Sequence, residues 1–597
     1  MERTHRCGEL RESDVGEAVT LQGWVHRVRD HGGKRFVDLR DREGLVQVVL
    51  SPEETEDFHE SEELGREYLL TVEGEVQERP EGTINEDMDT GEVEVSASSF
   101  EVVSESEVPP FSLDSEKTEE AREGLRFEHR YLDMRRPRVA DNLKKRHEFF
   151  HASRNFLAEN GFVEVETPYL SKSTPEGARD FVVPSRNFEG NFYGLPQSPQ
   201  LFKQLLMVGG MDRYYQVVRC FRDEDTRKDR QPEFTQLDLE VSFMEQDEFL
   251  QLMSELLTTA FEDAFDEEFE IPVEKITWQE AMDNWGSDRP DRRYGMKLHD
   301  VSSLVEGSEL NIFARTVEEE DGVVKGFRLE GKAEELSNSD MDSLIDYAEE
   351  EGAGGLVWVK LTSEGFESPV EDYLETETLR ELIDEFEAEA SDVLFFVADE
   401  KPVANEVLGS LRRHLADNVF DLAENAEGYD LLWITDFPLF SYEDGEFGSE
   451  HHPFTMPEEP EKLREADPDD EDALLQLDAD AYDVVLNGYE IGGGSKRIHD
   501  PELQQKVFDV LGLSEEEVEE RFGWFVDAFQ YGAPPHRGIA FGVDRILMVF
   551  QDEPNIREVI PFPKSKQGYD YLTGAPAPPR EDQLEGLGID VVDTEED

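Results

Sequence analysis

The stretch Phe221-Arg-Asp-Glu-Asp225, continued by Arg230-Gln-Pro-Glu-Phe-Thr-Gln236, decides the fold of the central part of this chain. An apolar run at residues 214–221 leads into it, and a second run at residues 234–243 overlaps its end. Two such runs on either side of a polar segment are typical of antiparallel strands joined by a long loop. The chain is therefore expected to carry a hairpin with charged residues at its loop.

The side chains of this hairpin suit a nucleotide. Arg222 can hold a phosphate, Glu224 can accept a hydrogen bond from an adenine edge, and Phe234 can stack on the ring. Far along the chain, Gly542-Val-Asp-Arg545 places a second arginine at a glycine turn before an apolar helix. The two strings together indicate a nucleotide site built from distant segments.

Together the two strings resemble motifs 2 and 3 of the class II aminoacyl-tRNA synthetases, and the residues around them resemble the bacterial-type aspartyl-tRNA synthetases. The resemblance covers roughly residues 1–575. It implies an α+β multidomain protein with an N-terminal OB-fold β-barrel, a catalytic domain on an antiparallel sheet, and an inserted α/β domain. It also implies a ligase that activates L-aspartate with ATP, uses Mg²⁺ and charges the 3′ end of tRNA-Asp.

The composition allows three or four globular domains but carries an extreme charge. The 597 residues include 58 Lys and Arg against 143 Asp and Glu, a formal net charge of −85 at pH 7. Phosphate binding normally rests on positive charge, so this sign opposes an RNA partner at ordinary salt. One interpretation is an acidic protein without a nucleic-acid partner. The other, which the motifs favour, is adaptation to a salt-rich cytoplasm, where the Debye length is about 3 Å at 1 M salt.

The small number of cysteines and the lack of a recognisable targeting signal predict a cytoplasmic protein. Only Cys7 and Cys220 occur, without the spacing of a disulfide framework or a zinc site. The first residues lack the apolar stretch of a secretory signal, and no run of about 18 apolar residues appears. We therefore expect a chain that is neither exported nor inserted in a membrane.

Turn and periodicity signals divide the chain. Short apolar runs between residues 19 and 103 predict a five-stranded barrel with a helical segment near residues 53–65. A helix capped by Asp141 and stopped by Gly161 is expected to open the catalytic part. The predicted divisions are an OB-fold anticodon-binding domain (1–107), a hinge (108–140), a first catalytic half (141–297), an insertion (298–430), a second catalytic half (431–573) and a C-terminal tail (574–597).

The barrel has the pattern of a site for single-stranded RNA. Arg29 precedes a glycine pair, Phe36 lies on the next strand, and Gln47 lies on the one after. An exposed aromatic beside Arg and Gln can stack an unpaired base and bond its edge. Phe36 could equally belong to the barrel core, but the resemblance to an anticodon-binding domain favours the RNA role. His31 and Gly82 resemble loop positions of relatives that also charge tRNA-Asn.

The resemblance assigns the substrate ammonium group to Glu176, Gln200 and Asp238. Ser198 and Pro199 predict a helix start that places Gln200 and Lys203 on one face.

The string Asn487-Gly-Tyr-Glu-Ile-Gly-Gly-Gly-Ser-Lys-Arg497 resembles the aspartate family's pattern, which implies that it forms the pocket for the substrate side chain. Its three consecutive glycines let a ligand approach the backbone, and Arg497 can grip a carboxylate with two parallel bonds. Lys203 would add a second positive charge, and His451 would close over the amino acid. Two cations favour a carboxylate over an amide. The pattern therefore favours aspartate over asparagine.

Asp483 and Glu490 are candidate metal ligands. They lie seven residues apart, a spacing of two helical turns or of one strand face. Paired carboxylates at an ATP site usually hold Mg²⁺, and the resemblance implies a magnesium ion here. The alternative is a structural salt bridge to Arg497.

For the reaction itself, the resemblance implies Arg222, Glu224 and Arg545 as catalytic residues, with Arg222 also binding the aspartate. No protein nucleophile is required, because positioning and charge stabilisation supply most of the catalysis. The full set implied for ATP is Arg222, Asp223, Glu224, Gln231, Phe234, Glu490, Gly542, Val543, Asp544 and Arg545.

Two features concern assembly and rival functions. The string Asn160-Gly-Phe-Val-Glu-Val-Glu-Thr-Pro168 resembles motif 1, which implies a homodimer. The rival functions are an asparaginyl-tRNA synthetase and a non-catalytic RNA-binding paralogue. The sequence leaves open whether tRNA-Asn is charged in addition to tRNA-Asp.

Overall fold

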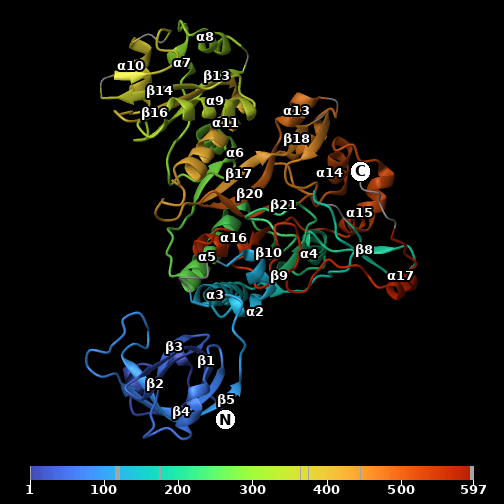
Figure 1. Cartoon of the computed structure of the whole chain (residues 1–597). Coiled ribbons are helices and arrows are strands. Elements are labelled where there is room, and N and C mark those ends of the chain that lie inside the picture. The colour runs from blue at the N-terminus through green and yellow to red at the C-terminus, as the bar shows by residue number, and fades with distance from the viewer. Residues whose placement is uncertain are drawn as a thin grey trace. The chain divides into compact units, whose positions relative to one another are not determined.

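The computed structural model describes residues 2–114, 121–173, 177–319, 321–363, 365–373, 376–443, 445–468 and 470–591 (Figure 1). The chain forms two compact units. Unit 1 comprises Met1–His147, Asp225–Pro232 and Glu553–Gln583, and unit 2 comprises Glu148–Glu224, Glu233–Asp552 and Leu584–Asp597. No described helix is long and apolar enough to cross a membrane.

The N-terminal part of unit 1 is a closed five-stranded barrel, blue in Figure 1. Alternate residues of its strands face inward and bury an aliphatic core, as period-2 patterning requires. The helical segment expected at residues 53–65 contracts to one short turn, Phe58–Glu63. The strands are β1 (Ala18–His31), β2 (Lys34–Asp41), β3 (Gly44–Leu50), β4 (Leu69–Glu78) and β5 (Val93–Ser104), in the order β1-β2-β3-β5-β4.

The β1–β2 hairpin turns on Gly32 and Gly33, whose φ angles are 64° and 81°. A two-residue turn with positive φ at both positions matches the twist of the flanking strands, and glycine adopts it without strain. The turn therefore fixes the register that pairs Arg29 with Phe36.

Three helices follow the barrel in the chain: α1 (Glu123–Glu128), α2 (Arg130–Asp133) and α3 (Pro137–Glu159). The expectation that Asp141 caps α3 was wrong, because the helix begins four residues earlier at Pro137. Proline suits a first helical position, where its missing N–H costs nothing. The predicted end is confirmed, since Gly161 follows with φ 78°.

Unit 2 is built on an eight-stranded sheet. Only its two outer pairs, β11–β17 and β6–β9, are parallel, and every pair between them is antiparallel. The antiparallel catalytic sheet expected from the sequence is therefore confirmed. In spatial order the strands are β11 (Glu274–Thr277), β17 (Leu431–Pro438), β20 (Asp478–Leu486), β21 (Tyr489–Lys496), β22 (His536–Gly542), β10 (Glu233–Ser242), β9 (Arg213–Phe221) and β6 (Val163–Glu164).

Helices pack on this sheet through aromatic clusters. Phe508 and Phe522 stack with ring centroids 5.6 Å apart, and Leu201 joins the same cluster. Phe265 stacks on Phe550 at 4.3 Å. The helices concerned are α4 (Gln200–Val208), α5 (Gln246–Phe265), α14 (Pro501–Val510), α15 (Glu515–Phe529) and α16 (Val543–Phe550).

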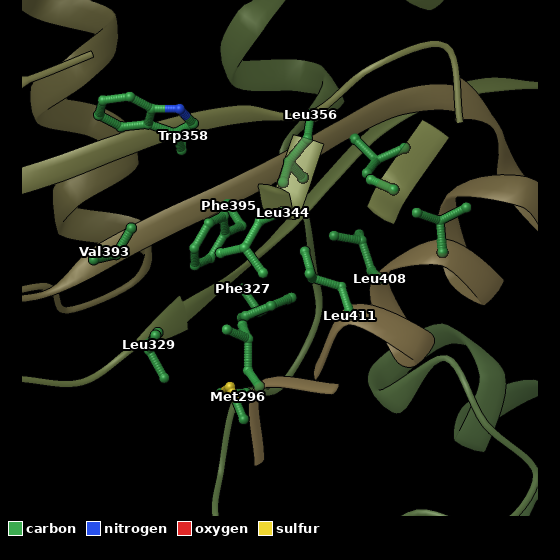
Figure 2. Close-up of a cluster of buried hydrophobic side chains, with 14 of the residues drawn as sticks. Met296, Phe327, Leu329, Leu344, Leu356, Trp358, Val393, Phe395, Leu408 and Leu411 are labelled. Carbon is green, nitrogen blue, oxygen red and sulfur yellow. The ribbon is translucent and has the colours of Figure 1, made fainter. Parts of the chain in front are cut away.

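The insertion forms its own antiparallel sheet, in the order β12-β13-β16-β14-β15. Its central strand is buried on both faces: Phe395 belongs to one hydrophobic cluster, shown in Figure 2, and its neighbour Phe396 belongs to another. The strands are β12 (His299–Asp300), β13 (Gly322–Leu329), β14 (Val357–Thr362), β15 (Gly365–Glu367) and β16 (Val393–Glu400), with helices α7 (Ser302–Val305), α8 (Asn311–Val317), α9 (Asn338–Glu350), α10 (Thr376–Glu385) and α11 (Lys401–His414) covering them.

Helix α6 (Trp278–Trp285) meets α11 of the insertion at a contact between two glycines. A Cβ added to Gly409 would lie 1.9 Å from the carbonyl oxygen of Gly286, so the two backbones touch directly. Beside them Arg412 is fully buried, with its guanidinium 4.9 Å from the Trp285 ring and 4.4 Å from the Tyr294 ring. The insertion is thus held against the catalytic sheet by a tight, specific joint.

Gly409→Ala is expected to destabilise the protein by about 1–3 kcal/mol, because the added methyl group forces two helices apart. Calorimetric melting should show a lower melting temperature. Gly586→Ala is the matched control, since a Cβ there meets nothing within 4 Å. Equal melting temperatures for both variants would contradict the proposed tightness of the joint.

Candidate active site

Four charged side chains meet at the centre of the eight-stranded sheet. Lys203 of α4 points at β10, where its Nζ lies 2.7 Å from Asp238 Oδ2 and 3.3 Å from Glu240 Oε2. Arg497, just after β21, donates from Nε to Glu240 Oε1 at 3.1 Å. All four side chains are fully buried. The structure therefore brings together three predicted residues around a fourth, Glu240, that the sequence analysis missed.

Glu240 reaches both cations because a glycine lies opposite it. It pairs in register with Gly538 of β22, and a Cβ on that glycine would lie 1.8 Å from Glu240 Oε2. The sequence signal that could have revealed Glu240 is its place two residues after Asp238 in the alternating run Leu237–Val241, since such residues share one face.

The pKa values of the two buried carboxylates shift in opposite directions. Burial raises the pKa of Asp238 to about 6, even though Lys203 favours its charged form. Burial also opposes the charge of Glu240, but Arg497 and Lys203 outweigh it and lower the pKa of Glu240. Glu240 is therefore the permanent counterion of the two cations, while Asp238 titrates near neutrality.

Two buried polar atoms in this cluster lack a partner among the described residues. They are Asp238 Oδ1 and Gln200 Nε2. Such atoms are costly unless a ligand or water satisfies them. An ammonium group would satisfy Asp238 Oδ1, while Gln200 Nε2 suits an acceptor such as a carboxylate. Glu176, the third residue assigned to the ammonium group, lies outside the described residues.

Two consecutive histidines flank the cluster. His451 Nε2 lies 3.3 Å from Asp483 Oδ1; burial lowers its pKa, but Asp483 outweighs burial and raises it overall. His452 was missed by the sequence analysis. It lies 2.5 Å from Arg497 Nη1, and burial together with Arg497 lowers its pKa well below the ordinary range. His452 is therefore a neutral neighbour of the arginine.

The residues predicted to bind the nucleotide base and phosphate lie where β9 ends and β10 begins. The antiparallel pairing of these strands confirms the predicted hairpin. The Arg222 guanidinium lies 5.1 Å from the centroid of the Phe234 ring, and its buried Nε has no partner among the described residues. Asp223 and Glu224 follow in the exposed start of the loop.

Motif 3 joins this hairpin through the sheet. Strand β22 ends at Gly542, opposite Gln236 of β10, and α16 begins directly at Val543. Asp544 is buried, and its Oδ2 accepts the backbone N–H of Thr235 at 3.0 Å. Asp544 thus ties α16 to the strand that carries Phe234.

Arg545 of α16 lies against β21. It donates from Nη1 to the backbone oxygen of Glu490 at 2.8 Å, and the Glu490 carboxylate lies 3.9 Å away.

The spacing of Asp483 and Glu490 suggested that they share one helix or one strand face, but they do not. They lie on β20 and β21, neighbouring strands joined at Asn487 and Gly488, and both carboxylates face Gly493. A Cβ on Gly493 would lie 2.6 Å from Asp483 Oδ1 and 3.6 Å from Glu490 Oε1. Burial raises the pKa of Asp483 to about 6. The ion pairs of Arg497 go to Glu240 rather than to either carboxylate.

The oxygen ligands at Gly493 fit Mg²⁺, which is typically held by one or two carboxylates together with substrate phosphates. The described residues contain no group of three or more His, Cys, Asp or Glu that could hold a metal by themselves. A magnesium ion at this position would therefore need the phosphates as further ligands.

Gln231 belongs to unit 1. Its Oε1 accepts the backbone N–H of Lys564 at 2.8 Å, and its buried Nε2 has no partner among the described residues. Its role toward ATP stays a prediction.

The predicted RNA residues of the barrel form a small polar surface. Arg29 Nη2 lies 2.6 Å from Asp38 and 3.0 Å from Gln47 Oε1. Phe36, the cross-strand partner of Arg29, is half-buried and lies outside the buried core. His31 and Gly82 occupy exposed loop positions, Gly82 with φ 85°.

Family comparisons agree with this architecture. Residues 122–566 match the family described as tRNA synthetases class II (D, K and N), and residues 19–103 match the OB-fold nucleic acid binding domain. The chain is therefore a class II aminoacyl-tRNA synthetase.

Whole-chain relatives narrow the family. The aspartate–tRNA ligase of Bacillus licheniformis is 46% identical over 593 residues, covering 99% of this chain and 98% of the relative. The aspartate–tRNA(Asp/Asn) ligase of Natranaerobius thermophilus is 48% identical over 601 residues, covering 99% of each. The chain belongs to the family of aspartate–tRNA ligases.

Solved structures agree in fold. Asparaginyl-tRNA synthetase from Pyrococcus horikoshii, complexed with asparaginyl-adenylate, has a TM-score of 0.58 at 20% identity, covering 95% of this chain and 98% of that one. Aspartyl-tRNA synthetase from Entamoeba histolytica has a TM-score of 0.56 at 20% identity, covering 94% and 91%.

Binding of L-aspartate in the absence of ATP is expected to weaken as the pH falls through 6. The ionised Asp238 attracts an ammonium group, and burial raises its pKa to about 6, so this attraction is present at pH 7.5 and lost below 6. If only the ionised form binds, affinity drops about tenfold per pH unit below the pKa. Calorimetric titration between pH 5.5 and 8 measures it.

His451 acts in the opposite direction, because its protonation would strengthen the binding of an anionic side chain. His451→Gln removes that effect, and the affinity of this variant for L-aspartate is still expected to decline as the pH falls. An affinity that rises toward low pH in this variant would contradict the role of Asp238.

Proposed function

We propose that the chain is an aspartate–tRNA ligase, which uses ATP to convert L-aspartate to aspartyl-adenylate and transfers the aspartyl group to tRNA-Asp. The observation that carries the proposal is the buried cluster of Lys203, Arg497, Asp238 and Glu240. Two cations held side by side offer donors to a side-chain carboxylate, and the unpartnered Asp238 Oδ1 offers an acceptor to the ammonium group. The relatives named above support the same substrate.

The first step needs positioning rather than a protein nucleophile. The α-carboxylate of aspartate attacks the α-phosphorus of ATP, the bond to pyrophosphate breaks, and charge develops on the phosphate oxygens. Arg222 would stabilise that charge at the strand end where Phe234 receives the adenine. Arg545 would hold the far phosphates. When bound at Asp483 and Glu490, magnesium would offset further negative charge on the phosphates.

The second step transfers the aspartyl group to the 3′ end of the tRNA. A hydroxyl of the terminal ribose attacks the carbonyl carbon of the mixed anhydride, and AMP leaves with the bonding electron pair. The cluster around Glu240 would keep the aspartyl side chain in place during the transfer.

Asparagine is the alternative substrate within the same fold. Glu240 already neutralises part of the charge of Lys203 and Arg497, so the discrimination rests on geometry as well as on charge count. An amide would present its NH₂ to a donor of Lys203 or Arg497, which leaves a buried donor unsatisfied at about 1–3 kcal/mol. A non-catalytic RNA-binding paralogue would not need Arg222, Glu490 or Arg545, all of which are present.

We extend the proposal to tRNA choice, assembly and setting. Charging of tRNA-Asn rests on His31 and Gly82 in the barrel loops and on relatives named for both tRNAs. A homodimer rests on the motif 1 segment, where Val163 is 47% exposed at the sheet edge and could be covered by a second copy. A salt-rich cytoplasm rests on the net charge of −85, because screening permits an acidic protein to approach RNA.

Charging of purified tRNA-Asp and tRNA-Asn with labelled aspartate, from dilute to molar KCl, tests the proposed function. We expect aspartate on both tRNAs, with the highest rate at high salt. Labelled asparagine should not be transferred, and Arg222→Met should give the background. Charging of tRNA-Asp alone would contradict the wider tRNA choice, and no charging at any salt would favour the non-catalytic paralogue.

Phe36→Ala should reduce the rate of tRNA charging at limiting tRNA by about tenfold, since base stacking on an aromatic contributes about 1–3 kcal/mol. Adenylate formation, measured by pyrophosphate exchange, should be unchanged. Val37→Ala, which hollows the barrel core next to it, is the control for general destabilisation. Equal losses in both reactions would return Phe36 to a structural role.

A further inference from the structure

The loop Asp225–Pro232 between β9 and β10 is held by one irregular segment, residues 556–566 of unit 1. The backbone oxygen of Lys228 accepts the N–H of Ile556 at 2.9 Å. Thr226 Oγ1 donates to the backbone oxygen of Lys566, and Gln231 Oε1 accepts the N–H of Lys564 at 2.8 Å. The loop is thus attached at three points to a segment that contains neither helix nor strand.

An irregular buried segment has backbone carbonyls that no ladder satisfies. Here one guanidinium group donates hydrogen bonds to four of these carbonyls. Arg130 donates to the backbone oxygens of residues 557, 558, 560 and 561 at distances of 3.0–3.2 Å. It also donates to Asp133 at 2.5 Å, and only 1% of its surface is exposed. The planar fork of arginine supplies five N–H groups in fixed directions, which lysine cannot do.

Arg130 is itself fixed by its neighbours. Asp133, fully buried, also accepts from Arg136 at 2.8 Å and from Arg126 at 3.4 Å, so its two oxygens bind three arginines. A chain of direct contacts therefore runs from α2 through Arg130 and the segment 556–566 to the loop.

We propose that Arg130 is a positioning residue for the nucleotide-binding loop. It acts through the segment: it sets the backbone path of residues 557–561, and that path places the partners of Thr226, Lys228 and Gln231. Without Arg130 the four carbonyls lose their shared donor, the segment loosens, and the loop loses its three attachment points together. The kinetic consequence rests on the proposed function, whereas the structural consequence does not.

Amide hydrogen exchange on the full chain tests the structural part. Arg130→Met should speed exchange in residues 225–232 and 556–566 together, by at least tenfold. Arg138→Met is the matched control, because Arg138 pairs with Glu553 in the same unit at 2.7 Å but its side chain is 42% exposed. Faster exchange in residues 556–566 with an unchanged loop would overturn the proposal. If Arg130→Met does not fold, Arg130→Lys, which retains the charge but not the fork, takes its place with the same outcomes.

Pyrophosphate exchange tests the kinetic part. Arg130→Lys should raise the KM for ATP roughly tenfold and leave the KM for aspartate within twofold, since only the loop is displaced. Thr226→Val should add little to the Arg130→Lys effect, because both act through the same attachment. Fully additive effects, or equal rises in both KM values, would overturn the role. A wild-type protein that activates no amino acid would refute the proposed function while leaving the exchange result to decide on Arg130.

Discussion

The structure depends on the placement of Glu240 between Lys203 and Arg497 inside the sheet. Two buried cations without counterions would cost several kcal/mol each; the loss of Glu240 would remove the carboxylate that Arg497 pairs with and leave Lys203 with Asp238 alone. Arg497 and Lys203 lower the pKa of Glu240, so its carboxylate serves as their counterion inside the sheet. Burying these charges costs stability at the position where we propose that the substrate binds.

This cluster constrains the rest of unit 2. Its members come from α4, β10 and the end of β21, and Glu240 fits only because Gly538 of β22 has no side chain. Glu240 and Arg497 are 257 residues apart in the chain, with the whole insertion that carries β12 to β16 between them. The site therefore exists only when the long-range register of the sheet is correct, and a slip of one residue would turn Asp238 and Glu240 to the other face.

The charge of the chain has a different distribution inside and outside. In the core, several buried carboxylates pair with arginine or lysine, as Asp133 and Glu558 do in unit 1. The excess of acidic residues must then lie at the surface, where salt screens it. An acidic surface is thus compatible with buried cationic side chains that interact with a ligand over short distances.

The sequence by itself determined the elements and much of the chemistry. The alternating strands of the barrel, the hairpin around Arg222 and the passage from β22 into α16 follow from local periodicity and turn residues. It placed the start of α3 wrongly because Asp141 is as plausible a cap as Pro137 is a first helical residue. The separation of Asp483 from Glu490 was misjudged because the hairpin turn at Asn487 and Gly488 was not recognised.

Only the tertiary structure decided which charges meet. His452 and Arg130 carry no local signal of their roles, and Glu240 is marked only by its place two residues after Asp238. The partners of these three residues lie 45, more than 420 and 257 residues away in the chain. Local sequence sets backbone preference over a few residues, whereas the pairing of buried charges depends on packing between distant segments.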